Sequence, residues 1–132
     1  MSTNARAAVT TARMERFAPT HGWANRLLRI DLSSRTIGVQ PLDGYIPDYI
    51  GGRGLAARPA WDLCPEPVDA LAPENPLMII TGALTGSRSP YSGRTAVCAF
   101  SPQAYPHNWF TRANIGHHWG AELKRAGYDG IV

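Results

Sequence analysis

Two residues with side chains suited to phosphate, Arg94 and Asn114, stand beside glycine turns in the last part of the chain. Arg94 follows Ser92-Gly93, and Asn114 precedes Ile115-Gly116. Glycine has no Cβ, so the backbone at such turns can approach a ligand closely. Arginine supplies a charged, two-pronged donor and asparagine an amide, both suited to phosphate or a polar heterocycle. The combination predicts a site for a large anionic cofactor.

The same residues also have purely structural interpretations. Arg94 could extend from a strand end into solvent, and Asn114 could cap the helix expected after it. A cap and a cofactor contact are compatible, because a helix N-terminus favours anions. Arg88 and Arg112 are expected to be solvated loop arginines, although either could screen a cofactor phosphate.

His117 and His118 suggest metal binding or proton transfer, but their spacing argues against it. Adjacent helical residues point about 100° apart, so both cannot easily serve one metal. We expect them on the surface of a first helical turn, with His118 able to pair with Glu122. Core or interface positions are expected for three tryptophans: Trp61, Trp109 and Trp119.

The elements that must position these residues predict an α+β fold with short helices. A helix should follow Gly51-Gly52 and be short or kinked, because Pro59 removes a backbone hydrogen bond. A second helix is expected over 116–125, with Gly127 as its left-handed stop. Strands are expected at 26–31 and 36–39 as a hairpin, and at 77–81, 95–100, 109–111 and 129–132.

Composition favours one packed domain in a chain of 132 residues, of which 44% are hydrophobic and 17% charged. Residues 1–21 are expected to be a disordered extension, and residues 22–132 a partial domain that looks cut at its C-terminus. The strand at 129–132 would then be an unpaired apolar edge, which promotes association.

The basic residues and the cysteines indicate which kinds of partner and which cell compartment to expect. Lys124 is the only lysine among thirteen basic residues, a bias that phosphate binding or a G+C-rich genome would each explain. The basic residues form no stripe, so we expect no nucleic-acid partner. Cys64 and Cys98 lack metal-type spacing and suit free thiols in a reducing cytoplasm. No segment is apolar and long enough to predict a membrane span.

Six sequence blocks, taken in order, resemble the N-terminal domain of the aldehyde:ferredoxin oxidoreductase family, whose members are tungsten- or molybdenum-pterin enzymes. The resemblance covers roughly residues 22–132. The blocks are Asn25-Arg26-Leu27-Leu28-Arg29-Ile30-Asp31-Leu32, Gly51-Gly52-Arg53-Gly54-Leu55-Ala56, Leu71-Ala72-Pro73-Glu74-Asn75-Pro76-Leu77, Gly82-Ala83-Leu84-Thr85-Gly86, Gly93-Arg94 and Gly120-Ala121-Glu122-Leu123-Lys124.

The resemblance implies an α+β platform, with a mostly antiparallel sheet, on which a bis-pterin metal cofactor rests. Arg94 would sit against the pterin or its phosphate. Asn114 would contact the cofactor, with its backbone carbonyl helping to hold a magnesium ion that bridges the two pterin phosphates. Gly116 would allow close backbone approach there, and Arg53 would be structural or adjacent to the cofactor. Two features depart from the family pattern: the pair His117 and His118, and Pro59.

The implied activity is oxidation of an aldehyde to a carboxylic acid, with electrons passing through a [4Fe–4S] cluster to ferredoxin or a related carrier. No cluster ligand and no catalytic residue is expected in this segment, so the remaining domains or subunits would supply them. We also consider a homodimer. Two alternatives remain: a non-catalytic module that binds a pterin or phosphate compound or docks onto a larger subunit, and a gene fragment without independent activity.

Overall fold

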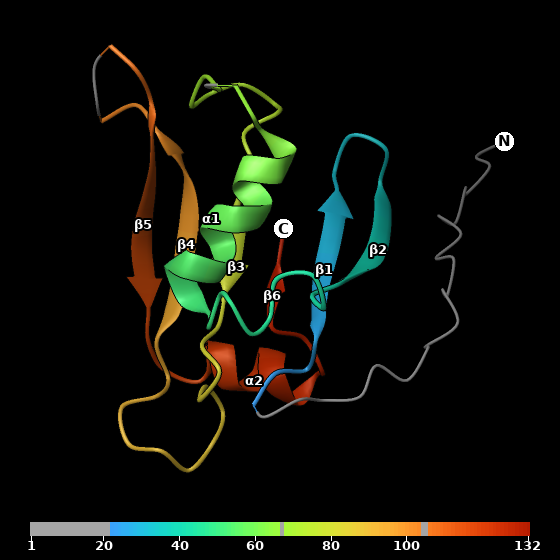
Figure 1. The fold of residues 1–132 in the computed structure, drawn as a ribbon, viewed down its shortest axis with the longest axis vertical. Helices are drawn as coiled ribbons and strands as arrows, with labels where there is room; N and C mark the ends of the chain where they lie inside the picture. Colours follow the sequence, from blue (N-terminus) through green and yellow to red (C-terminus); the bar gives the residue numbers. More distant parts are fainter. Residues whose placement is uncertain (1–21, 67, 104–105) are drawn as a thin grey trace, which may run out of the picture.

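The computed structural model describes residues 22–66, 68–103 and 106–132, which form a six-stranded sheet with two helices (Figure 1). The extension expected over 1–21 lies outside the described residues. The elements in chain order are β1 (Arg26–Asp31), β2 (Thr36–Pro41), α1 (Gly52–Leu63), β3 (Met78–Ile80), β4 (Thr95–Ser101), β5 (Trp109–Ile115), α2 (Trp119–Arg125) and β6 (Gly130–Ile131).

The strand order β2-β1-β6-β3-β4-β5 corrects two expectations from the sequence. The sheet is mixed rather than mostly antiparallel, because β6 runs parallel to β1. The strand expected over 129–132 is also not an unpaired edge. Leu27 and Leu28 of β1 pair with it on one side, and Ile79 and Ile80 of β3 pair with it on the other. The association predicted from an unpaired terminal strand therefore loses its structural basis.

The β1–β2 hairpin forms where it was expected, and its second strand continues past residue 39 to Pro41. Ile30 lies opposite Ile37, and the turn closes where the backbone N–H groups of Ser33 and Ser34 each donate to Asp31 Oδ1 at 2.9 Å. The backbone hydrogen bond from Ser34 holds the pKa of Asp31 below its usual value. This local turn fixes which face of the hairpin each side chain occupies.

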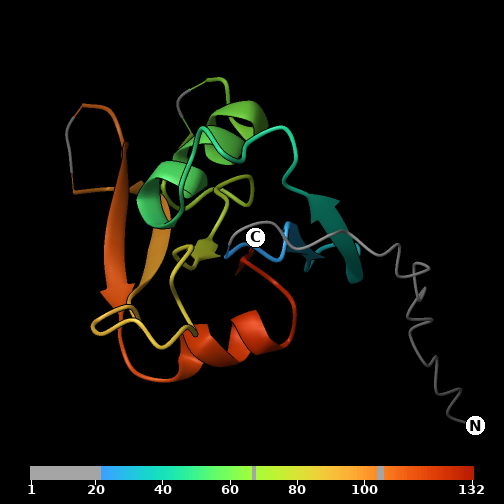
Figure 2. The same ribbon diagram turned by 60° about the horizontal axis from the view of Figure 1, so that its bottom comes forward.

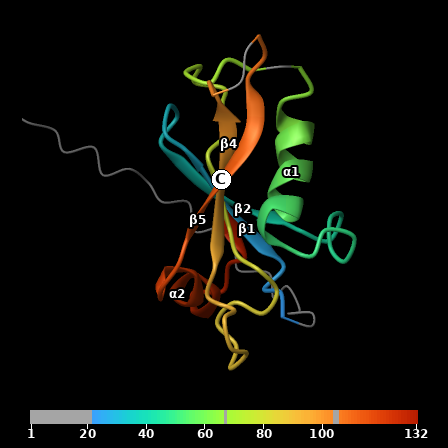
Figure 3. The ribbon, with the colours of Figure 1, turned by 90° about the vertical axis from the view of Figure 1, so that its left-hand side faces the viewer.

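Helix α1 covers one face of the sheet and packs on β3 and β4. Figure 3 shows this arrangement with the sheet seen nearly edge-on. Small residues on the helix allow the close approach, and the contact forms the core: Leu27, Leu42, Leu55, Ala56, Ala60, Met78, Ile80, Ala96 and Cys98. The helix is longer than expected, because it continues through Pro59 to Leu63.

Helix α2 lies at one end of the sheet, against the opposite face from α1 (Figures 2 and 3). Its contact depends on Gly120, because a Cβ there would lie 2.1 Å from Thr95 Oγ1 and 3.1 Å from Thr85 Cγ2. The helix begins at Trp119 rather than 116, and Gly127 ends it with the expected positive φ of 87°. The close packing of α2 on Thr95 fixes the start of β4.

Candidate functional site

The predicted site residues meet at one end of the β4–β5 ladder. Thr95 pairs with Ile115 and Ala96 with Asn114, so Arg94, immediately before Thr95, lies across from Gly116. The turns also touch, since a Cβ on Gly93 would lie 3.4 Å from the carbonyl oxygen of His117. The sheet thus brings together residues that the sequence separates by twenty positions.

Arg53 joins this end of the sheet through the first turn of α1. A Cβ added to the preceding residue, Gly52, would lie 3.9 Å from the Cβ of Ala96. Ala96 is the strand partner of Asn114 and belongs to the core under α1, so Asn114 is on the face that α1 covers. The N-terminus of α1, Arg53 and Asn114 therefore occupy the same side of the sheet.

Two tight turns hold these elements in place. The backbone N–H of Gly52 donates to the carbonyl of Thr81 at 2.9 Å, which ties the start of α1 to the end of β3. In the following turn, buried Thr85 accepts from Gly82 N–H at 3.0 Å through Oγ1 and donates to the Ser92 carbonyl at 3.0 Å. Hydrogen bonds to Thr85 therefore hold both ends of the loop over residues 82–92, which leads to Arg94.

Asn114 is not a helix cap, which was one of the two interpretations of its position in the sequence. It lies within β5, which continues to Ile115 instead of ending near Thr111, and it caps no helix. The N-cap of α2 is His118, which makes no side-chain capping hydrogen bond. Exposed polar residues and an alanine alternate at the end of β5, so the apolar pattern gives no sign that the strand continues.

The glycines of the region divide into two kinds. Some glycines allow two backbone segments of the protein to pack closely and leave no room for a ligand. At Gly51, a Cβ would lie 2.9 Å from the Thr81 carbonyl oxygen. Gly116 is different, because a Cβ there would meet no atom within 4 Å among the described residues. The backbone beside Asn114 is thus open to an incoming group.

The charges at this end of the sheet suit an anion. Arg53, Arg94 and Asn114 are exposed, and within the described residues neither arginine forms an ion pair. Exposed guanidinium groups without carboxylate partners retain their donors for phosphate oxygens. The residues present therefore fit a phosphate-bearing cofactor. In the part of the chain that the structure describes, no group of three or more His, Cys, Asp or Glu could hold a metal ion.

Other candidates from the sequence take different positions. His117 and His118 are both exposed, with their rings edge to face, and His117 has φ 69°. Glu122 forms an ion pair with Arg125, not with His118. Cys64 and Cys98 are buried free thiols, as expected. The three tryptophans are outside the core, with exposures of 68%, 71% and 40% for Trp61, Trp109 and Trp119.

Sequence reasoning missed the buried ion pair of Lys124 with Asp129. The side chains are 9% and 1% exposed, and the carboxylate also accepts from the backbone N–H groups of Ala24 at 3.0 Å and Arg26 at 3.3 Å. Lys124 donates to the Gly22 carbonyl at 2.6 Å. The sequence signal for this pair was the presence of a single lysine beside twelve arginines. A buried position can select lysine, because its compact ammonium fits where a guanidinium would not.

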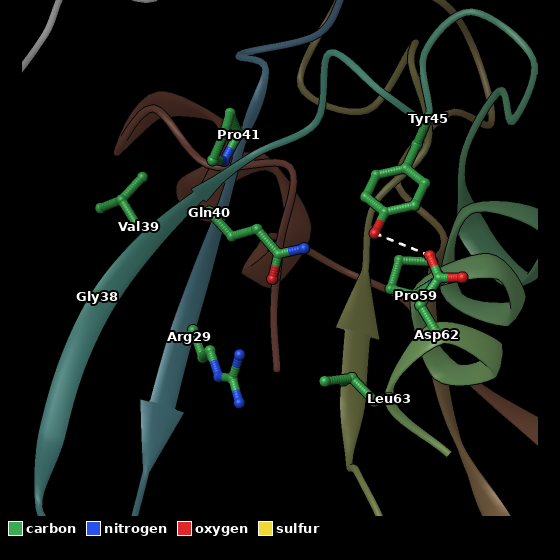
Figure 4. A pocket seen from close by; sticks show the side chains of 9 residues that line it. All are labelled: Arg29, Gly38, Val39, Gln40, Pro41, Tyr45, Pro59, Asp62 and Leu63. Carbon is green, nitrogen blue, oxygen red and sulfur yellow. Dashed lines mark hydrogen bonds between the residues drawn. The ribbon is translucent and has the colours of Figure 1, made fainter. Parts of the chain in front are cut away.

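A hollow of about 440 Å³ lies away from these residues, between the β1–β2 hairpin and the end of α1 (Figure 4). Tyr45 donates to Asp62 at 3.0 Å across it, and Arg58 pairs with the same carboxylate. Arg29 faces this hollow from β1. None of the predicted site residues lines it.

No helix within the described residues is long and apolar enough to cross a bilayer.

Comparison with known proteins matches the chain to a family of oxidoreductases. The family model described as "Aldehyde ferredoxin oxidoreductase, N-terminal domain" matches residues 27–132. Tungsten-containing aldehyde ferredoxin oxidoreductases of Pyrococcus furiosus and Thermococcus kodakarensis are 41% and 39% identical over 113 residues. These matches cover 85% of this chain, which spans 18% of each relative.

A solved structure supports the same fold. The active site complex BamBC of benzoyl coenzyme A reductase, in complex with 1,5-dienoyl-CoA, is 32% identical with a TM-score of 0.76. The match covers 84% of this chain and 17% of that one.

Proposed function

Because the chain belongs to the aldehyde ferredoxin oxidoreductase family, as its N-terminal domain, we propose that it forms part of the cofactor platform of a tungsten- or molybdenum-pterin oxidoreductase. The whole protein would oxidise aldehydes to carboxylic acids. When bound, the metal–pterin group supplies the two-electron chemistry, and the protein supplies position and charge.

The observation that carries this proposal is the meeting of Arg53, Arg94, Asn114 and Gly116 at one end of the sheet. Arg94 would bind a pterin phosphate through its guanidinium. Asn114 would contact the cofactor, with its backbone carbonyl directed to a magnesium ion between the two pterin phosphates. The open backbone at Gly116 would admit the group, and Arg53 would add charge from the start of α1.

The chain covers only a small share of each relative, so we expect further domains or subunits in the whole protein. Because the chain spans 18% of these relatives, remaining domains or subunits would supply the ligands of a [4Fe–4S] cluster and contact ferredoxin or a related carrier. A homodimer and a cytoplasmic location complete the proposal. Two buried free thiols are consistent with a reducing compartment.

The test replaces Arg94 in the full-length protein. Arg94→Ala should reduce metal–pterin occupancy, because a charged donor to phosphate is worth about 1.5–3 kcal/mol, or about 10- to 150-fold in binding. Tungsten and molybdenum per polypeptide, measured by elemental analysis, give the readout. Arg125→Ala is the control, because Arg125 is exposed and pairs only with Glu122 among described residues. Unchanged metal content in Arg94→Ala would remove this residue from the site.

The likeness to benzoyl coenzyme A reductase favours a second candidate, reduction of an aromatic acyl-CoA. The full-length protein should distinguish the two. Aldehyde-dependent reduction of an electron acceptor supports the first, and consumption of an aromatic CoA thioester with a low-potential donor supports the second.

A further inference from the structure

A long acid-free segment surrounds the candidate site. Residues 75–121 contain no aspartate or glutamate, yet they contain Arg88, Arg94 and Arg112. The segment runs from β3 into the first turn of α2, so it builds both strands of the β4–β5 ladder. A long acid-free stretch leaves the local potential positive, which attracts anions.

The strand register places Arg112 on the side of the candidate site. Arg112 lies opposite Cys98, and Asn114 lies opposite Ala96. Both partners belong to the core under α1, so Arg112 and Asn114 share the α1 face of β5. Arg112 was expected in a solvated loop, and the structure instead fixes it in a strand, two residues from Asn114.

Arg53 and Arg112 approach this face from α1 and from β5. Arg112 is the strand partner of Cys98. Arg53 follows Gly52, where an added Cβ would lie 3.9 Å from the Cβ of Ala96, two residues from Cys98. Burial raises the pKa of the Cys98 thiol and, in keeping with this placement, both arginines oppose that rise. Neither arginine forms an ion pair within the described residues. Two exposed guanidinium charges on one face of the sheet, without a carboxylate partner in the described part of the chain, leave that face positive and favourable for an anion.

We propose that Arg112 is a further cofactor-binding residue, which binds a phosphate group of the cofactor together with Arg53. The inference rests on the proposed function and adds a contact to it. Arg112 and Arg53 would reach the phosphate from β5 and α1, while Arg94 and Asn114 bind nearer the end of the ladder. The two guanidinium forks together match a phosphate dianion, and each can donate two parallel hydrogen bonds.

The experiment uses the full-length, cofactor-loaded protein and follows tungsten and molybdenum retained during dialysis against inorganic phosphate. Arg112→Gln should lose metal about tenfold faster than the unaltered protein, because a charge-assisted contact is lost. Arg112→Lys keeps the charge and should lose metal at an intermediate rate. The matched control is Arg29→Gln, an exposed arginine that faces the hollow between the β1–β2 hairpin and the end of α1 (Figure 4), and it should retain metal normally.

Two further measurements make the outcomes distinct. Thermal unfolding should show equal midpoints for all variants, because Arg112 is exposed. Equal metal loss from Arg112→Lys and Arg112→Gln with a lowered midpoint would make the role structural and overturn the inference. If Arg112→Gln retains metal while Arg94→Ala loses it, the inference fails and the proposed function stands. If both retain metal, the inference fails and Arg94 is also removed from the proposed site.

Discussion

The buried ion pair between Lys124 and Asp129 gives the sharpest prediction about stability. Asp129→Asn preserves the shape of the side chain, but its single oxygen can replace only one of the two acceptors, Oδ1 for the N–H of Ala24 or Oδ2 for the N–H of Arg26. It removes the charge opposite an ammonium whose side chain is only 9% exposed. Breaking a buried pair by removing one partner costs about 3–5 kcal/mol, because the other charge stays buried without compensation.

That magnitude is a large fraction of the stability of a domain of this size, about 5–15 kcal/mol. Lys124→Met should cost a similar amount, because it leaves the carboxylate with only backbone donors and the Gly22 carbonyl without its partner. The double variant Lys124→Met/Asp129→Asn should cost about 2–3 kcal/mol less than the sum, because it contains no orphaned charge.

Urea unfolding of the chain at pH 7, followed by tryptophan fluorescence, measures all four states of this double-mutant cycle. The matched control is Arg125→Met, which removes an exposed partner of Glu122 and should cost less than about 1 kcal/mol. Single replacements that each cost under about 1 kcal/mol and add without coupling would refute the reasoning. They would show that water screens the pair as it does at a surface.

Two further predictions concern the packing of the sheet. Gly120→Ala should destabilise the chain by about 2 kcal/mol, because its Cβ would lie 2.1 Å from Thr95 Oγ1; Gly38→Ala, with open space around it, serves as control, and similar unfolding midpoints would contradict the packing argument. Cys98 should react slowly with iodoacetamide at pH 8, because burial raises its pKa above the usual value and the thiol stays protonated. The folded state then keeps a proton on the thiol that the unfolded state releases. The contribution of Cys98 to the free energy of unfolding is therefore complete below about pH 8.5 and declines as the pH rises beyond it. If a Cys98→Ala variant loses the same stability at alkaline pH, the thiol is not the cause of that loss.

Local chemistry made parts of the fold predictable. The β1–β2 hairpin follows from a turn whose hydrogen bonds lie within four residues, Asp31 to Ser34. The helix after Gly51-Gly52 follows from its alanine-rich face, and Gly127 stops α2 through its own φ. Each of these depends on residues close together in sequence, where propensity and turn chemistry act.

The errors arose where distant residues decide the structure. No local pattern shows that Gly130 and Ile131 would enter the sheet between β1 and β3, because that depends on two other strands. Arg112 and Asn114 looked like loop residues because edge strand β5 exposes them to solvent. The resemblance to the family assigned Asn114 a contact with the cofactor. Its position before the expected helix suggested a helix cap.

The position of β6 also has a consequence for how the chain acquires its structure during synthesis. Leu27 pairs with Gly130, 103 positions further along, and β6 lies between β1 and β3 in the sheet that the described residues form. At about 5–20 residues per second, a ribosome needs roughly 5–20 seconds to produce that partner. During this interval one edge of β1 has no neighbour, and Leu27 and Leu28 remain available to chaperones or to other nascent chains.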